Sequence, residues 1–148
     1  MSRITPVVRP PASTPGKVAG ALLLVVVAFQ AALAAGAPWG EATQGGANPG
    51  VLPEPLRLAS ALGAVVYLAL AGVAGTRWAP PVLRRRVLHV GAGVMVAGAL
   101  LNIASPSFIE RMIWVPVTVA LMALLWRAAR HDSLLPGSGS PVRRGRPA

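Results

Sequence analysis

The chain has 148 residues, of which 54% are hydrophobic and only 12% charged, and its formal net charge is +10. A soluble domain has about twice that charged fraction, so these numbers exclude a disordered chain, a coiled coil and an ordinary cytosolic enzyme. The chain has no cysteine, which excludes disulfides, thiolate metal sites and thiol redox chemistry. The composition therefore indicates a small integral membrane protein of one domain.

Four apolar stretches have the length that a membrane-spanning helix requires. A bilayer core needs roughly 20 apolar residues in an α-helix, with about 17 as a working minimum. We therefore predict an all-α, four-helix bundle in the membrane. The expected spans are residues 18–37, 58–75, 87–103 and 112–126, of which the last is short and bracketed by Arg111 and Arg127.

Residues 76–86 separate the second span from the third and are predicted to form a loop. They contain the arginine run 84–86 and the pair Pro80-Pro81. Each Arg at mid-membrane costs ~2.5–3.5 kcal/mol, and prolines remove helix hydrogen bonds. The arm of residues 1–17 and the tail of residues 131–148 are basic and rich in proline, so both are expected to be disordered around a four-span domain of residues 18–130.

The basic residues are distributed unequally between the two expected sides of the membrane. Twelve of the 14 fall in the arm, in the second loop or after the fourth span, and only Arg57 and Arg111 fall in the other two loops. The positive-inside rule then places both termini in the cytoplasm of a bacterial plasma membrane. All four tryptophans fall near an expected interface, which agrees with these spans. The charge is explained without nucleic acid, and we expect the lipid bilayer as the main partner, with anionic lipid at the basic tails.

A secretory signal peptide is the alternative for the first span. The basic arm, the apolar run and Ala32-Leu33-Ala34 fit that pattern. The arm is long, however, the run reaches full spanning length, and Pro38 would make a poor cleavage position. We therefore expect a retained helix, and cleavage would leave the other three spans oriented as before.

Small residues recur at a four-residue spacing within three of the spans. Such faces let helix backbones approach closely, either between copies of the chain or inside one bundle. We expect internal packing, because alanine is so abundant that these patterns arise easily. The residues are Ala28, Ala32 and Gly36 on the first span, Ala59 and Gly63 on the second, and Gly91, Met95 and Ala99 on the third.

Ionisable groups inside the spans normally mark membrane function, and here they are scarce. Small four-span multidrug exporters are similar in size, but they depend on an intramembrane carboxylate that the expected spans lack, which argues against proton-coupled export. The polar candidates are Gln30, Tyr67 and Asn102. We expect them to hydrogen-bond between helices, although their convergence on one cavity would favour transport. His89 is interfacial, and no second buried histidine is expected, so no haem, metal or other cofactor is predicted.

Polar residues also gather on the side predicted to be extracytoplasmic. Two carboxylates there have the chemistry of a general acid and base. No hydrolase, metalloprotease, phosphate-binding or dinucleotide-binding motif accompanies them, so no catalytic residue is predicted. Ser107 and Glu110 match a capping box that opens the fourth span. The candidate outer cluster comprises Trp39, Glu41, Glu54, Arg57, Glu110 and Arg111.

Two loop segments carry a family resemblance. The first loop reads GAPWGEA from residue 36, followed by Gly45-Gly46, Leu52-Pro53, Arg57 and Ser60, and the last hairpin has residues 102–105, Arg111, Trp114 and Pro116. These motifs resemble small four-span actinobacterial membrane proteins that are classed as domains of unknown function. The resemblance covers residues 21–126. It implies the same topology, with the first loop facing the start of span four, and it implies no activity.

Three functional hypotheses follow. The leading one is a non-enzymatic accessory or interaction subunit that associates with another membrane protein or with itself. It is motivated by the scarcity of titratable residues in the spans, the turn-rich outer loop and the small helix faces. The alternative is a small homo-oligomeric transporter or permease for a neutral or lipophilic solute. An enzyme at the extracytoplasmic face is the third.

Overall fold

Residues 12–134 are described by the computed structural model, and they form four helices without a β-strand. Each helix is long and apolar enough to cross a membrane. The predicted all-α, four-span architecture is confirmed. The helices are α1 (Thr14–Ala35), α2 (Glu54–Gly75), α3 (Pro81–Ala104) and α4 (Phe108–Leu134).

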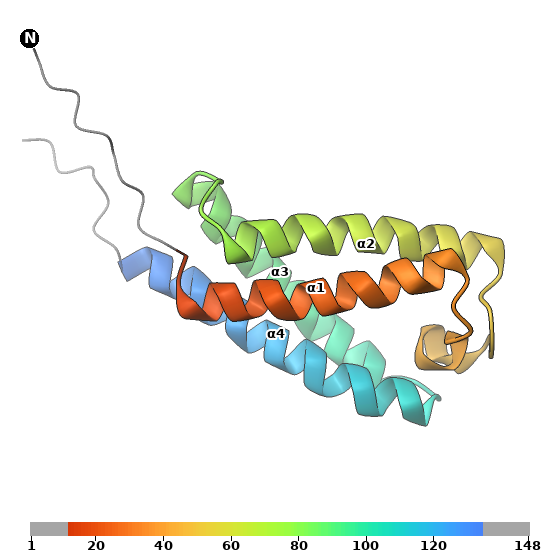
Figure 1. Cartoon of the computed structure of the whole chain (residues 1–148). Coiled ribbons are helices and arrows are strands. Elements are labelled where there is room, and N and C mark those ends of the chain that lie inside the picture. Colours follow the sequence, from red (N-terminus) through yellow and green to blue (C-terminus); the bar gives the residue numbers. More distant parts are fainter. Residues whose placement is uncertain (1–11, 135–148) are drawn as a thin grey trace, which may run out of the picture.

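The bundle is built from two helical hairpins. Helices α1 and α2 lie along one another, α3 and α4 do the same, and α1 also packs against α4 (Figure 1). Helix α2 contacts α3 only over a short stretch. One end of the bundle, here the loop end, carries the α1–α2 connection with its short 3-10 helices η1 (Gly40–Ala42) and η2 (Gln44–Gly46). The opposite end, here the termini end, carries the α2–α3 turn, the beginning of α1 and the end of α4 (Figure 1).

The helices extend beyond the predicted spans. Helix α1 begins at Thr14, inside the predicted arm, and Ser13 caps it by accepting a hydrogen bond from the Gly16 N–H at 3.4 Å. The loop predicted over residues 76–86 is wrong from Pro81 onward, because Pro81 stands in the first turn of α3, where a missing N–H costs nothing. Helix α4 has 27 residues and is not short. Residues 131–134, predicted as tail, belong to α4, whereas residues 1–11 and 135–148 lie outside the described residues.

Large apolar side chains cover the outer surface of the helices. Leu62, Val90 and Leu101 are 70%, 67% and 73% exposed. Soluble monomers rarely expose such continuous apolar area, whereas a bilayer accommodates it. The interior is also apolar, with Leu23 and Leu125 fully buried. The chain is therefore a multi-pass membrane protein whose helices contact lipid.

An arginine at the fourth position of three helices binds the end of the preceding helix. Arg57 Nε donates to the Ala34 carbonyl at 3.0 Å, and a guanidinium nitrogen of Arg111 donates to the Ser105 carbonyl at 2.8 Å. Arg84 is 1% exposed and donates to carbonyls at the end of α2. The last carbonyls of a helix lack intrahelical donors and carry its negative dipole end, so a cation stabilises them.

Glycines lie where the backbones of α1 and α2 approach closely. A Cβ atom on Gly20 would lie 3.1 Å from the Gly75 Cα, so a side chain at this position would require the neighbouring backbone to shift by a few tenths of an ångström. The small-residue face predicted on the third span is internal, since Gly91, Met95 and Ala99 are all buried. Ala28 and Ala59 are exposed and do not contribute to internal packing.

Candidate functional site

A cavity of about 640 Å³ lies between the helices toward the loop end. All four helices and the η2 segment contribute to its wall, which is mainly apolar. This size is within the range of small-molecule sites, which are typically apolar with a few polar groups. The polar and aromatic side chains of the wall are Gln30, Thr43, Gln44, Tyr67, Asn102, Ser105, Glu110, Thr118, Phe29 and Trp114.

The three polar residues predicted within the spans meet in this cavity. Gln30 comes from α1, Tyr67 from α2 and Asn102 from α3, and all three are half-buried. Within residues 12–134 their side chains make none of the interhelical hydrogen bonds that were expected for them. Their amide and hydroxyl groups are thus free to bind a molecule inside the cavity.

Glu110 is a buried carboxylate in the wall of the cavity. Its side chain is 7% exposed, and Oε2 accepts hydrogen bonds from the Gly45 N–H at 2.8 Å and from the Ser105 hydroxyl. The predicted capping box forms only in part: the Ser107 hydroxyl accepts from the Glu110 N–H at 3.2 Å, whereas the Glu110 carboxylate bonds elsewhere. Because the fourth span was predicted to begin at residue 112, a carboxylate inside the bundle was missed.

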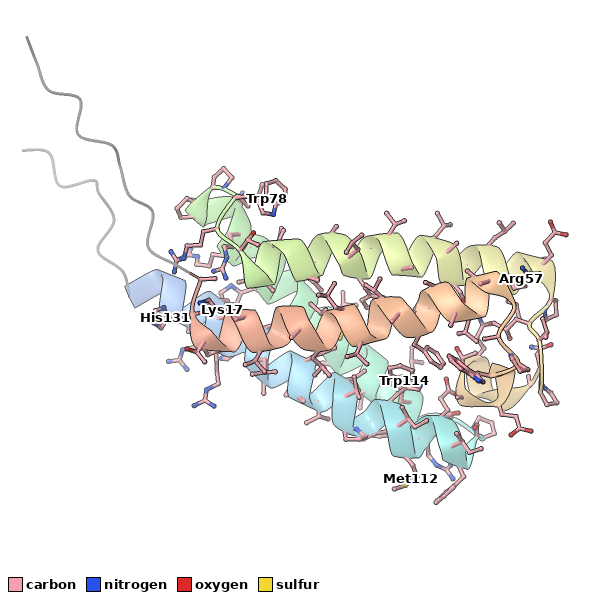
Figure 2. All side chains as sticks on the ribbon, viewed as in Figure 1. Lys17, Arg57, Trp78, Met112, Trp114 and His131 are labelled. Carbon is pink, nitrogen blue, oxygen red and sulfur yellow. The ribbon has the colours of Figure 1, made fainter. Side chains whose placement is uncertain are left out.

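The α1–α2 connection is fixed to the start of α4. The Ser107 hydroxyl donates to the Glu41 carbonyl at 2.6 Å, and Trp114 Nε1 donates to the Ala42 carbonyl at 2.7 Å. The expectation that the first loop faces the start of span four is therefore confirmed. In Figure 2, Trp114 lies toward the loop end of the bundle, where its ring meets Phe29 edge-on at a centroid distance of 4.6 Å. The loop thus closes over part of the cavity.

The backbone of this connection depends on glycines that no other residue replaces easily. Gly45 has φ of +76°, which presents its N–H to Glu110. A Cβ atom on Gly40 would lie 1.8 Å from the Asn48 carbonyl oxygen. The turn-rich sequence of the loop therefore encodes one definite conformation.

The predicted outer cluster does not form a single site. Arg57 and Arg111 bind carbonyls at two different helix ends, and Trp39 stacks on Phe29 with a centroid distance of 5.9 Å. The carboxylates of the cluster also differ in their exposure. Glu41 and Glu54 are exposed, while Glu110 is buried in the cavity wall.

The termini half of the bundle is closed. Leu23, Leu88 and Leu125 are fully buried there and do not line the cavity, so the cavity does not extend to them.

His89 lies in the termini half, away from the cavity. Its Nδ1 is 2.9 Å from the Arg85 carbonyl, which makes Nδ1–H the donor, and its ring meets Trp126 edge-on. It lines a separate apolar groove between α3 and α4 with Trp126 and Arg127.

The described residues contain no group of three or more His, Cys, Asp or Glu that could hold a metal ion. Comparison with family models, with curated proteins and with solved structures found no match. The fold and the cavity define a four-helix, multi-pass membrane protein with an internal, mainly apolar cavity that a few polar side chains line. The resemblance to actinobacterial four-span proteins stays a prediction.

Proposed function

We propose that this protein is a small permease that binds a largely apolar solute in the cavity at its loop end. The observation that carries the proposal is the convergence of Gln30, Tyr67 and Asn102 on one cavity, without hydrogen bonds among themselves. A solute with an apolar body and a few hydrogen-bonding groups matches this wall. All four helices of one chain line the cavity, and we propose the site without a homo-oligomer.

The closed termini half supports movement of the solute as well as its binding. A carrier exposes its site to one side of the membrane at a time, and here the packed leucines seal one half. The α1–α2 and α3–α4 hairpins are the natural moving units, because α2 contacts α3 only over a short stretch. Movement of one hairpin against the other would open the sealed half.

The accessory-subunit hypothesis loses one of its supports. It rested partly on a turn-rich loop available to a partner, and this loop instead bonds to Ser107, Glu110 and Trp114 of its own chain. No catalytic residues are proposed, because Glu41 and Glu54 are exposed while Glu110 is buried in the cavity wall.

We propose a bacterial plasma membrane as the location and the cytoplasm as the side of the termini end. Seven of the nine basic residues within 12–134 lie at the termini end, and Figure 2 shows Lys17 and His131 there, with Arg57 at the opposite end. Such asymmetry is what the positive-inside rule describes.

The test is a binding screen followed by a flux assay. The protein in lipid nanodiscs is screened against small, mostly apolar alcohols, amides and amines, with empty nanodiscs as the blank. We expect Tyr67→Phe, which removes one hydroxyl, to weaken the best ligand about tenfold, the value of one buried hydrogen bond. Trp126→Phe, in the separate groove, serves as the control and should leave binding unchanged. Uptake of that ligand into proteoliposomes supports a permease, whereas no ligand or no uptake contradicts it.

A further inference from the structure

The cavity contains one formal charge that the proposed function leaves unused. Among residues 12–134, Glu110 is the only carboxylate in its wall, and it is more than nine-tenths buried. Its two hydrogen-bond donors, the Gly45 N–H and the Ser105 hydroxyl, are both neutral and both bind Oε2. Burying a carboxylate is costly unless a cation or further donors compensate it.

No cation of the described residues compensates Glu110. The nearest candidate in sequence, Arg111, directs its guanidinium to the Ser105 carbonyl at 2.8 Å instead. Arg57 is likewise engaged with the Ala34 carbonyl of α1. The carboxylate therefore faces the cavity without an ion-pair partner within residues 12–134.

The aromatic residues of the wall suit a cation as well. Trp114 and Phe29 both line the cavity, and their rings are held against each other at 4.6 Å. The Trp114 ring is fixed further by its bond to the Ala42 carbonyl. An ammonium group gains from the face of an aromatic ring, most of all tryptophan, in a desolvated site. The amide oxygens of Gln30 and Asn102 are additional acceptors for its N–H groups.

We infer that the cavity selects a lipophilic amine, whose ammonium group pairs with the Glu110 carboxylate while its apolar body fills the space between the helices. This inference rests on the proposed function and names its substrate class. If Glu110 only held the loop in place, it would need an oxygen atom that accepts the hydrogen bonds of Gly45 and Ser105. It would not need a negative charge for that role. The two roles therefore separate in a variant that keeps the acceptor and removes the charge.

The experiment compares 4-phenylbutylamine with 4-phenylbutanol by calorimetry at pH 7. The protein is held in phosphatidylcholine nanodiscs, whose zwitterionic surface does not concentrate the amine. We expect wild type to bind the amine at least about tenfold more tightly than the alcohol, the scale of a charge-assisted hydrogen bond over a neutral one. Glu110→Gln keeps an oxygen for Gly45 and Ser105, and it should abolish this preference by weakening the amine, while the alcohol still binds.

Glu54→Gln is the matched control, because it removes the same charge from an exposed position at the loop end. It should leave the preference for the amine intact. If wild type bound both compounds equally, the amine inference would be overturned, whereas the proposed solute site would be supported. An equal loss in Glu54→Gln and Glu110→Gln would also overturn it. In the proteoliposome assay, uptake of the alcohol without uptake of the amine would support a permease but would exclude an amine as its solute.

Discussion

Arg84 is the largest side chain that is fully buried in the bundle. Its Nε donates to the carbonyls of Val73 and Thr76 at 3.0 and 3.1 Å, and a terminal nitrogen donates to the Ala74 carbonyl at 2.9 Å. It thus satisfies the end of α2 from the first turn of α3, and it fixes the tight turn between them. From the sequence, Arg84 is indistinguishable from its neighbours in the arginine run.

Replacing Arg84 by Met should lower the free energy of unfolding by about 2–4 kcal/mol, because buried carbonyls would lose a charged donor while the apolar volume is kept. The measurement is the thermal unfolding of the protein in detergent. Arg85→Met, at the exposed neighbouring position, is the control and should change stability by less than about 0.5 kcal/mol. Equal effects of the two substitutions would refute the assigned role of Arg84.

The position of Glu110 at a helix start can be predicted from the sequence, but the orientation of its carboxylate cannot. The Ser107-x-x-Glu110 spacing correctly predicts that α4 begins here, and the Ser107 hydroxyl does cap it. The pattern cannot show that the carboxylate turns away from its own helix start. That orientation depends on the Gly45 N–H, which lies 65 residues away in the chain.

At the scale of elements, the α1–α2 hairpin depends on the absence of side chains where the two backbones cross. Gly16 faces the Ala74 carbonyl, and Gly20 faces the Gly75 Cα and the Ala71 carbonyl. Backbone contact of this kind gives van der Waals packing where lipid removes the hydrophobic drive between helices. The small residues predicted to mediate packing on this span, Ala28, Ala32 and Gly36, lie nearer the other end of α1, and Gly16 and Gly20 were not predicted.

Gly20→Ala should therefore destabilise the protein by about 1–3 kcal/mol, although alanine favours a helix, because its Cβ atom would lie 3.1 Å from the Gly75 Cα. Gly93→Ala is the matched control on α3, where a Cβ atom meets nothing within 4 Å. It should be neutral or stabilising by up to about 1 kcal/mol. Thermal unfolding of both variants decides the point, and a stabilised Gly20→Ala would contradict the close crossing.

The number and order of the helices could be read from hydropathy, since four apolar runs are long enough to span a bilayer. Their ends could not, because a helix continues past the apolar run wherever its charged residues find partners. Arg84 at the start of α3 and Arg111 at the start of α4 find such partners, because each donates to a carbonyl at the end of the preceding helix. Proline was also misread: Pro81 begins a helix instead of breaking one.

At the scale of the whole molecule, the cavity is a consequence of how the hairpins pair. Gln30, Tyr67 and Asn102 are far apart in the chain, and each could be recognised as unusual for its span. Whether they meet depends on the rotation of each helix about its axis and on which helices are neighbours. Neither property follows from hydropathy, so the three residues could be named from the sequence but not brought together.

The proposed orientation gives a prediction for the whole molecule. The chain has no cysteine, so single cysteines report their own position. Ala47→Cys in the α1–α2 connection should react with a membrane-impermeant maleimide on intact cells, and His131→Cys at the termini end should react only after permeabilisation. Both positions are exposed. The reverse pattern would place the loop end in the cytoplasm.

Cysteine reactivity at two adjacent positions of α3 tests whether the polar residues of the spans line one cavity. Asn102 lines the cavity, whereas Ile103 is 56% exposed on the outer surface of the same helix turn. A charged methanethiosulfonate reagent attacks the thiolate, which forms in a polar, hydrated site and not against lipid. We expect Asn102→Cys to react at least about tenfold faster than Ile103→Cys, although it lies one residue further from the loop end. Equal rates, or a faster Ile103→Cys, would contradict the cavity.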